Sequence, residues 1–345
     1  MPIRMVSRTE AIVFGSIIVV VLLLTFLVAI PAQPSSSSLP NLGKAPELAG
    51  TQEWLNSNPL SISGLRGKVV LVDFWTYSCI NCIRTLPYLE SWHEKYSGKG
   101  LVIIGVHSPE FDFEKNFDNV KSAVQRFGIR YAVVQDNDHA TWSAFENNYW
   151  PRKYLIDKDG YIRYDHIGEG GYEETEKAIQ SLLMETGVDA GMNTTPAQGG
   201  QLQIGTPELY LGYVFSRRPL GNREGFVPEA AINYSEPEVS FPNTVYLSGQ
   251  WFNSEDHVRS IKDSKLFLIY SSKDVYIVAG GSSRLSVKID GSPITPDYYG
   301  SDSNEGTVTI GGQRLYNIIS APIAGTHTLE IDASPGLELY TFTFG

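Results

Sequence analysis

Two residues in this chain of 345 have the type and spacing for sulfur chemistry, Cys79 and Cys82. Cysteines separated by two residues either exchange electrons as a dithiol and a disulfide or supply two thiolate ligands to a metal. A zinc site needs four ligands, and no two of the six histidines have the close spacing of a zinc-binding pair. The sequence therefore favours a redox pair, and because the chain has no other cysteine, its thiol chemistry must occur there.

Two other interpretations of this pair are weaker. A lone cysteine is commonly buried and unreactive, but two at this spacing beside a strand and a helix are not typical of that role. Thr76 and Cys79 also match part of a peroxidase motif, yet Val72 stands where that motif has a proline. The second thiol, that of Cys82, further favours dithiol exchange.

A strand and a helix must position the pair. Residues 67–75 form a β-rich apolar run that is typical of a strand buried on both faces. Apolar residues then recur at steps of three and four over residues 86–96, which predicts a helix. The start of a helix offers unpaired N–H groups and a positive dipole end, which stabilise a thiolate. We expect Cys79 to be the exposed nucleophile and Cys82 the shielded thiol that resolves the mixed disulfide.

Further strands and helices alternate up to residue 184. The apolar runs predict strands at residues 101–106, 131–134, 153–156 and 162–166, and helices at 114–127 and 173–184. Asp159 and Gly160 lie between the last two of these strands, where an Asp-Gly pair signals a hairpin turn. This alternation predicts an α/β domain with a largely parallel sheet and a terminal hairpin.

Four segments of this domain resemble the TlpA/DipZ branch of the thioredoxin family. They are VDFWTYSCINCIRTLPYL (72–89), VHSPEF (106–111), YWP (149–151) and GEGGY (168–172). The resemblance implies a thioredoxin-like fold over residues 46–186 and thiol–disulfide oxidoreductase activity on protein disulfides or thiols. It also implies no metal, and no cofactor beyond the redox-active disulfide of Cys79 and Cys82.

The resemblance assigns roles to five more residues. Asp73 corresponds to the buried carboxylate beneath the thiols, whose raised pKa suits it to relay a proton from the second cysteine. A strand-end aspartate paired with a lysine is the alternative for this residue. Pro151 corresponds to the cis-proline that faces the dithiol, with an ordinary turn proline as its alternative. Trp75, Tyr77 and Trp150 are expected to border the site and to bind substrate, with plain core or surface packing as the alternative for Trp75 and Tyr77.

Two positions depart from the family pattern. Thr85 stands where many TlpA-type reductases of cytochrome c maturation have a glutamate, and Ile80-Asn81 replaces the Gly-Pro of ordinary thioredoxins. Both changes leave the direction of electron flow open. We expect a reductase in cytochrome c maturation or disulfide repair, supplied by a CcdA-like membrane partner. A disulfide-forming oxidase or isomerase is the alternative.

The amino-terminal part of the chain indicates a membrane anchor. Residues 11–32 carry no charge and match the ~20 residues that a membrane-spanning helix needs. Two arginines precede this segment, so the positive-inside rule places residues 1–10 in the cytoplasm and the later domains outside the cell membrane. A cleaved signal peptide that ends near Ala29 or Ala32 is the alternative. Residues 33–45, rich in serine and proline, are expected to form an extended linker.

The carboxy-terminal part has a different pattern. Residues 187–205 are rich in small and polar residues and are expected to form a second linker. Residues 206–345 alternate short apolar runs with turn signals, which predicts an all-β, jelly-roll-like sandwich. The expected strands are residues 245–247, 265–270, 274–279, 284–289, 307–310, 315–319, 327–331 and 338–344.

Three segments of this second domain resemble the carbohydrate-binding-module-like domain that ends DipZ proteins. They are TPELYLGY (206–213), QRLYNII (313–319) and YTFTFG (340–345). The resemblance implies a glycan as candidate ligand, and a glycan-binding protein with an accessory redox domain as an alternative function. Tyr298 and Tyr299 are the aromatic pair most expected to be exposed, although aromatic residues on alternating strands are more often core. A net charge of −11 argues against a nucleic-acid partner.

Overall fold

The computed structural model describes residues 39–196 and 205–345, and Pro40–Gly345 form one compact unit. The expected cytoplasmic tail, the expected anchor at residues 11–32 and parts of both expected linkers lie outside the described residues. Within the part of the chain that the structure describes, no helix is long and apolar enough to cross a membrane.

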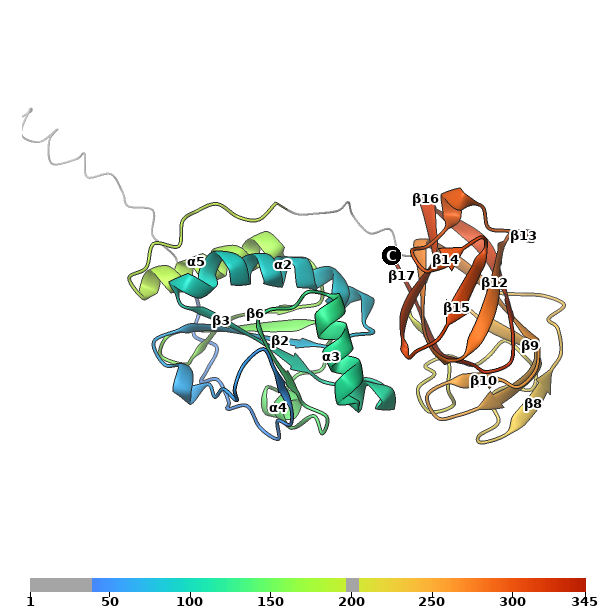
Figure 1. The fold of residues 1–345 in the computed structure, drawn as a ribbon, viewed down its shortest axis with the longest axis horizontal. Helices are drawn as coiled ribbons and strands as arrows, with labels where there is room; N and C mark the ends of the chain where they lie inside the picture. The colour runs from blue at the N-terminus through green and yellow to red at the C-terminus, as the bar shows by residue number, and fades with distance from the viewer. Residues whose placement is uncertain (1–38, 197–204) are drawn as a thin grey trace, which may run out of the picture. The chain divides into compact units, whose positions relative to one another are not determined.

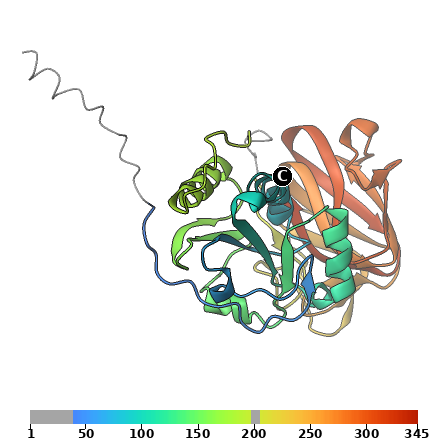
Figure 2. The ribbon, with the colours of Figure 1, turned by 60° about the vertical axis from the view of Figure 1, so that its left-hand side comes forward.

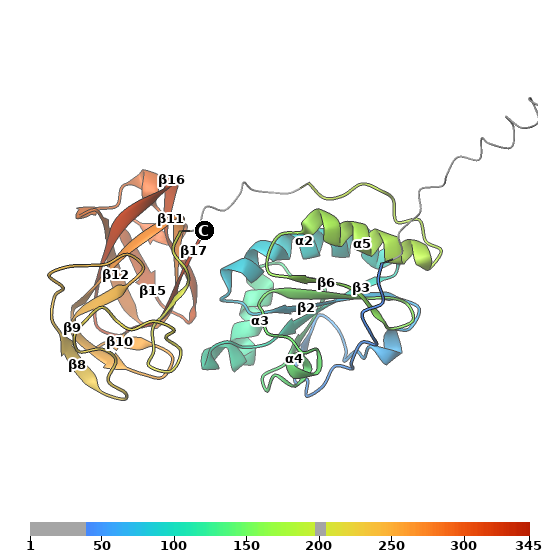
Figure 3. The same cartoon turned by 180° about the vertical axis from the view of Figure 1, so that it is seen from behind.

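The first domain is a six-stranded sheet flanked by helices (Figures 1 and 3). Its strands are β1 (Trp54–Leu55), β2 (Val69–Trp75), β3 (Leu101–His107), β4 (Ala132–Gln135), β5 (Arg152–Ile156) and β6 (Ile162–Ile167). They follow the order β1-β4-β3-β2-β5-β6, in which β2, β3 and β4 are parallel and the remaining neighbours antiparallel. The predicted α/β fold and terminal hairpin are confirmed, but the sheet is mixed rather than largely parallel, because only β2–β3 and β3–β4 are parallel pairs. Strand β1 is an edge strand that the sequence pattern did not indicate.

Strand β2 lies inside this sheet and leads directly into the cysteine pair. It is hydrogen-bonded to β3 on one side and to β5 on the other, and all seven of its residues are buried. This burial on both faces explains why its sequence is a continuous apolar run rather than an alternating one. Because β2 ends at Trp75, the chain leaves the sheet just before the two cysteines.

Four helices flank the sheet: α2 (Ile80–Tyr96), α3 (Phe117–Arg126), α4 (Ala140–Ala144) and α5 (Tyr172–Glu185). Short 3₁₀ turns occur at η1 (Ser63–Leu65), η2 (Ser97–Lys99) and η3 (Asp112–Lys115). Helices α2 and α5 lie side by side on one face of the sheet, and α4 lies on the other (Figures 1 and 3). Helix α3 begins later than predicted because η3 precedes it and Asn116 caps it, accepting a hydrogen bond from the Asn119 N–H at 3.2 Å.

The second domain is all β. Its strands are β7 (Leu209–Tyr210), β8 (Ala231–Tyr234), β9 (Val245–Asn253), β10 (Val258–Ser260), β11 (Ser264–Gly281), β12 (Ser283–Ile289), β13 (Ser292–Pro293), β14 (Ser303–Asn304), β15 (Thr307–Ile310), β16 (Arg314–Ala333) and β17 (Leu337–Phe344), with a 3₁₀ turn η4 (Pro296–Tyr298). The predicted all-β class is confirmed, but the strands form one 11-stranded sheet instead of the two separate sheets of a sandwich.

The single sheet arises from long strands that change partners. Strand β11 pairs with β9 along its first half and with β17 along its second, so the sheet curls around its own core (Figure 2). The strands expected separately at residues 265–270 and 274–279 are both parts of β11. A register shift between Ser272 and Asp274 accommodates the polar residues that interrupt the apolar pattern.

Candidate active site

The two cysteines lie at the junction of β2 and α2. Cys79 is the N-cap residue of α2, and its Sγ accepts a hydrogen bond from the Cys82 N–H at 3.3 Å. The thiols are not bonded to each other; Cys79 is half-buried and Cys82 is buried. A sulfur at a helix N-terminus that faces a backbone N–H is placed where negative charge is stabilised. The geometry therefore matches the expected division into an accessible thiol and a shielded one.

Asp73 lies on β2, is buried, and is close enough to Cys82 for its charge to affect that thiol. Burial raises the pKa of Asp73 from its ordinary 3.8 to about 7, and the nearby Lys153 charge partly opposes this increase. The pKa of Cys82 is raised by burial and, to a smaller extent, by Cys79 and Asp73. A carboxyl group with a pKa near neutrality is suited to accept a proton from such a thiol.

Lys153 is the partner of Asp73 across the sheet, in register on β5. Its side chain is buried, and its Nζ donates a hydrogen bond to the Gly168 carbonyl at 3.3 Å. Burial lowers the pKa of Lys153. The proton relay and the lysine pairing expected for Asp73 are therefore not exclusive, because a buried aspartate and a buried lysine are register partners here.

Cys79 and Cys82 can carry out disulfide exchange in two steps. The Cys79 Sγ attacks one sulfur of a substrate disulfide, the substrate S–S bond breaks, and one substrate thiolate leaves. The Cys82 thiol then loses its proton and attacks the Cys79 Sγ, which releases the second substrate thiolate and forms the Cys79–Cys82 disulfide. Two electrons pass from the protein to the substrate.

A buried carboxylate fixes the loop that carries the pair. Glu114 on η3 accepts hydrogen bonds from the Ser78 hydroxyl, from the Glu110 N–H at 2.6 Å and from the Phe111 N–H at 3.0 Å. Glu114 has no exposed surface, and burial raises its pKa. These bonds connect the residue before Cys79 to the loop after β3, so Glu114 is a positioning residue that sequence reasoning missed.

Trp75 and Tyr77 support the site from beneath rather than bordering it. Both are buried, with 0% and 1% of their surfaces exposed. Trp75 meets His107 edge-on and Tyr77 stacks on the same ring. Burial lowers the pKa of His107 to about 3, which keeps the imidazole neutral. The structure therefore favours the core-packing alternative for Trp75 and Tyr77, because neither side chain has appreciable exposed surface to offer a substrate.

Trp150 and Pro151 were expected near the dithiol, and the structure shows Trp150 at the Cys79 cavity. The Trp150–Pro151 peptide bond is cis, as expected. The half-buried Trp150 ring lines a cavity at Cys79 and donates a hydrogen bond through Nε1 to the Ser108 carbonyl at 3.0 Å. The Pro151 carbonyl already accepts a hydrogen bond from the Gly168 N–H at 2.8 Å.

The cavity at Cys79 measures about 60 Å³ and has walls from both domains. The first domain contributes Ser78, Cys79, Ile80, Asn81, Glu110 and Trp150, and the second contributes Glu208, Tyr210, Val278, Thr341 and Thr343. Four of these second-domain residues, Glu208, Tyr210, Thr341 and Thr343, lie within the TPELYLGY and YTFTFG segments that support the family resemblance. No sequence signal placed them at the dithiol, because their position depends on how strands from distant parts of the chain pack. Glu110 could have been found, since it lies within the VHSPEF segment that supports the family resemblance.

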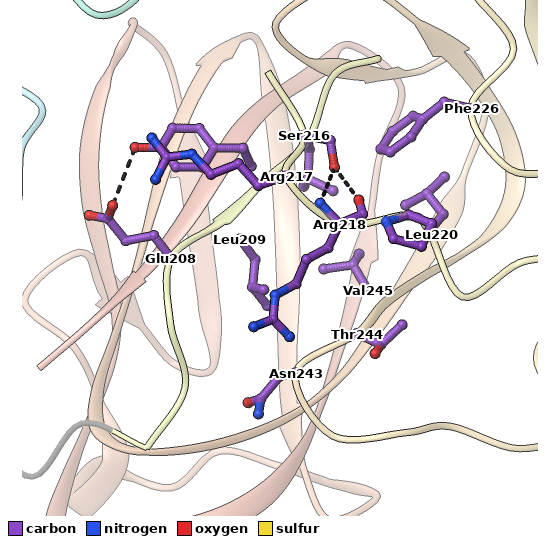
Figure 4. Close-up of a pocket in the computed structure, with 13 residues that line it drawn as sticks. Glu208, Leu209, Ser216, Arg217, Arg218, Leu220, Phe226, Asn243, Thr244 and Val245 are labelled. Carbon is purple, nitrogen blue, oxygen red and sulfur yellow. Dashed lines mark hydrogen bonds between the residues drawn. The ribbon is translucent and has the colours of Figure 1, made fainter. Parts of the chain in front are cut away.

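A hydrogen bond between the domains lies at this cavity. The Tyr210 hydroxyl donates to the Glu110 carboxylate at 2.6 Å. Burial raises the pKa of Glu110 to about 8. The ring of Tyr210 lies against the Arg217 guanidinium, 4.9 Å from its centre, and its hydroxyl is also within hydrogen-bond distance of the Glu208 carboxylate, at 3.3 Å. Figure 4 shows Glu208 and Arg217 in this arrangement. Tyr210 therefore has a fixed orientation toward the first domain.

Two further predictions concern metals and sugars. Among residues 39–196 and 205–345, no group of three or more His, Cys, Asp or Glu side chains is placed to hold a metal ion. Tyr298 and Tyr299, the pair expected to be exposed, are partly buried and pack against the core of the second domain.

Comparison with known proteins agrees with this chemistry. Family models match residues 41–183 (Redoxin) and 206–345 (Thioredoxin like C-terminal domain). Protein DipZ of Mycobacterium tuberculosis is 37% identical over 319 residues, which cover 90% of this chain and 44% of that protein. Thiol-disulfide oxidoreductase YkuV of Bacillus subtilis is 32% identical over 41% of this chain and 95% of its own. Thiol-disulfide oxidoreductase ResA of Bacillus thuringiensis is 30% identical over 37% of this chain and 71% of its own.

The fold and the dithiol define a thiol–disulfide oxidoreductase. Within this class, the chain belongs to the TlpA/ResA-like branch of the thioredoxin family that also contains DipZ. It spans less than half the length of the DipZ proteins that it matches.

Proposed function

We propose that this chain is a membrane-anchored dithiol reductase that works outside the cytoplasm. In this role Cys79 and Cys82 deliver two electrons to disulfides of exported proteins, including those of apocytochromes c. The observation that carries the proposal is the buried Asp73 close to Cys82. A reductase must deprotonate its second thiol after the mixed disulfide has formed, and a buried carboxylate with a pKa near neutrality can accept that proton.

The anchor and the electron donor are the parts of the proposal that rest on sequence. The uncharged segment at residues 11–32 supports single-pass anchoring in the cell membrane. The resemblance to DipZ proteins supports a CcdA-like membrane protein as the source of electrons. The same resemblance equally supports cytochrome c maturation and disulfide repair as the processes that use these electrons. A glycan ligand for the second domain rests on resemblance alone.

Insulin reduction tests the catalytic part of the proposal. The full chain, supplied with dithiothreitol, should accelerate the precipitation of reduced insulin, and Cys79→Ser should abolish the acceleration. Lys121→Gln, which removes an exposed charge on α3, is the matched silent variant. If the full chain gave no acceleration while Cys79→Ser still bound members of a glycan panel, the glycan-binding alternative would replace the reductase.

Protease treatment of intact spheroplasts tests the location. If the chain is anchored with both domains outside, added protease should digest it without lysis of the cell, and it should sediment with membranes after lysis. Protection from protease until lysis would contradict the proposed topology.

A further inference from the structure

A second hollow lies next to the dithiol, and Ile80 lines both it and the small cavity at Cys79. This second hollow is a cleft of about 540 Å³. One wall comes from α2 and from Arg126 and Phe127 at the end of α3, and the other from the second domain, including Asp302 and Arg314. The cleft is large enough for the body of a small molecule, whereas the cavity at Cys79 admits little more than a sulfur and its neighbouring carbon.

The cleft has more positive than negative charge. Arg314 is fixed by an ion pair with Asp302 at 2.7 Å, and its guanidinium lies 3.7 Å from the centre of the Tyr316 ring. Arg126 has no carboxylate within ion-pair distance among the described residues, and it lies over the Phe127 ring at 4.7 Å. The pKa of Arg126 is lowered by burial and by the neighbouring Arg314 charge, as expected when two positive groups lie close together.

We propose that this cleft binds the carboxylate end of a low-molecular-weight disulfide whose sulfur atoms enter the cavity at Cys79. The inference rests on the thiol–disulfide oxidoreductase activity and adds a small anionic substrate to the protein substrates proposed above. A guanidinium binds a carboxylate through paired N–H donors, and Arg126 offers these donors in a cleft that adjoins the cavity at Cys79 through Ile80.

The reaction is the same exchange with a small substrate. The Cys79 thiolate bonds to one sulfur of the disulfide R–S–S–R, the S–S bond breaks, and the first R–S⁻ leaves and takes a proton from water. Cys82 then loses its proton to Asp73 and attacks the Cys79 Sγ, which breaks the mixed disulfide and releases the second R–S⁻, and this thiolate also takes a proton from water. The protein dithiol is oxidised by two electrons, and the disulfide is reduced to two thiols.

A single-turnover experiment tests the cleft. The full chain is reduced, freed of reductant and mixed with excess glutathione disulfide, which carries carboxylates, or with hydroxyethyl disulfide, which is neutral. Tryptophan fluorescence follows oxidation of the dithiol at increasing disulfide concentration. Arg126→Gln should raise the half-saturating concentration of glutathione disulfide about tenfold, the effect of about 1.4 kcal/mol. The half-saturating concentration of hydroxyethyl disulfide should change less than about twofold in the same variant.

Two further variants complete the design. Arg126→Lys keeps the charge and should restore part of the affinity, and Lys121→Gln removes one positive charge from the same helix outside the cleft and should leave both substrates unaffected. An equal effect of Arg126→Gln on both disulfides, or no effect on either, would overturn the proposal. Failure of the wild-type chain to oxidise with glutathione disulfide alone would also overturn it. Failure with both disulfides and with insulin would instead sink the dithiol activity itself.

Discussion

Asp73 and Lys153 are register partners on the antiparallel strands β2 and β5, and each side chain is 1% exposed. The Asp73 Oδ1 has no hydrogen-bond partner among the described residues. Such a carboxyl is costly to ionise, and the buried lysine offsets only part of that cost. The relationship leaves Asp73 poised to change its charge near neutral pH, close to the thiol that must lose a proton.

Replacement of this carboxyl should slow the second step of the reaction. In Asp73→Asn we expect the rate of mixed-disulfide resolution to fall by about 10²-fold, the usual contribution of a positioned general base. The wild-type rate should rise with pH through about 7, where Asp73 ionises, and the variant should lose this rise. Stopped-flow measurements from pH 5 to pH 9 check both. An unchanged pH profile in Asp73→Asn would remove Asp73 from the reaction.

The same carboxyl should make stability depend on pH. The folded-state pKa of about 7 lies above the ordinary 3.8, so folded Asp73 holds a proton that the unfolded chain has lost. Its stabilising contribution is complete below about pH 4 and is lost as pH rises through about 7. Relative to wild type, Asp73→Asn should gain on the order of 4 kcal/mol in unfolding free energy between pH 4 and pH 8. Urea unfolding of both proteins at pH 4 and pH 8 measures this gain. If the difference in unfolding free energy between wild type and Asp73→Asn were the same at the two pH values, Asp73 would have an ordinary pKa.

The two thiols should behave differently when each is removed. Cys82→Ser keeps the nucleophile and lacks the resolving thiol, so it should accumulate a mixed disulfide between Cys79 and a disulfide substrate. Cys79→Ser should form no adduct, because Cys82 is buried beneath it. Intact mass spectrometry after incubation with glutathione disulfide distinguishes the two variants. Adduct formation by Cys79→Ser and not by Cys82→Ser would reverse the assigned roles.

The carboxylate beneath the loop should matter for stability. Glu114→Ala leaves three donors without their acceptor, the Ser78 hydroxyl and the Glu110 and Phe111 N–H groups. Buried unsatisfied donors are costly, so we expect a loss of roughly 3 kcal/mol in unfolding free energy. Asp118→Ala, at an exposed position on α3, is the control and should cost less than about 1 kcal/mol. Similar losses in the two variants would mean that Glu114 does not fix the loop.

Local sequence patterns predicted the longer elements of the first domain because these have short-range signals, whereas the short β1 and α4 were missed. The apolar run of β2, the helical spacing of α2 and the Asp-Gly turn at Asp159 and Gly160 each depend on a few neighbouring residues. Cys79 and Cys82 could therefore be placed at a strand–helix junction. The sequence could not decide whether Trp75 and Tyr77 border the site or belong to the core, because it does not reveal that both side chains are covered.

The rest of the site depends on long-range packing. Thr341 and Thr343 lie more than 250 residues after Cys79 in the sequence, and no periodicity relates β17 to the dithiol. The length of β11 was also missed, because a bulge lets polar residues continue a strand that the apolar pattern ends. The second-domain walls of the cavity become visible only when the two domains are seen in contact, and the full length of β11 only when its strand partners are known.

The reduction potential of the Cys79–Cys82 pair tests the central claim most directly. It is measured on the full chain by equilibration against dithiothreitol or glutathione, with trapped thiols counted by mass. A dithiol that donates electrons should have a potential near that of thioredoxin, about −270 mV. A value near about −120 mV would mean that the reduced form is strongly favoured, and it would contradict the reductase account in favour of a disulfide-forming oxidase.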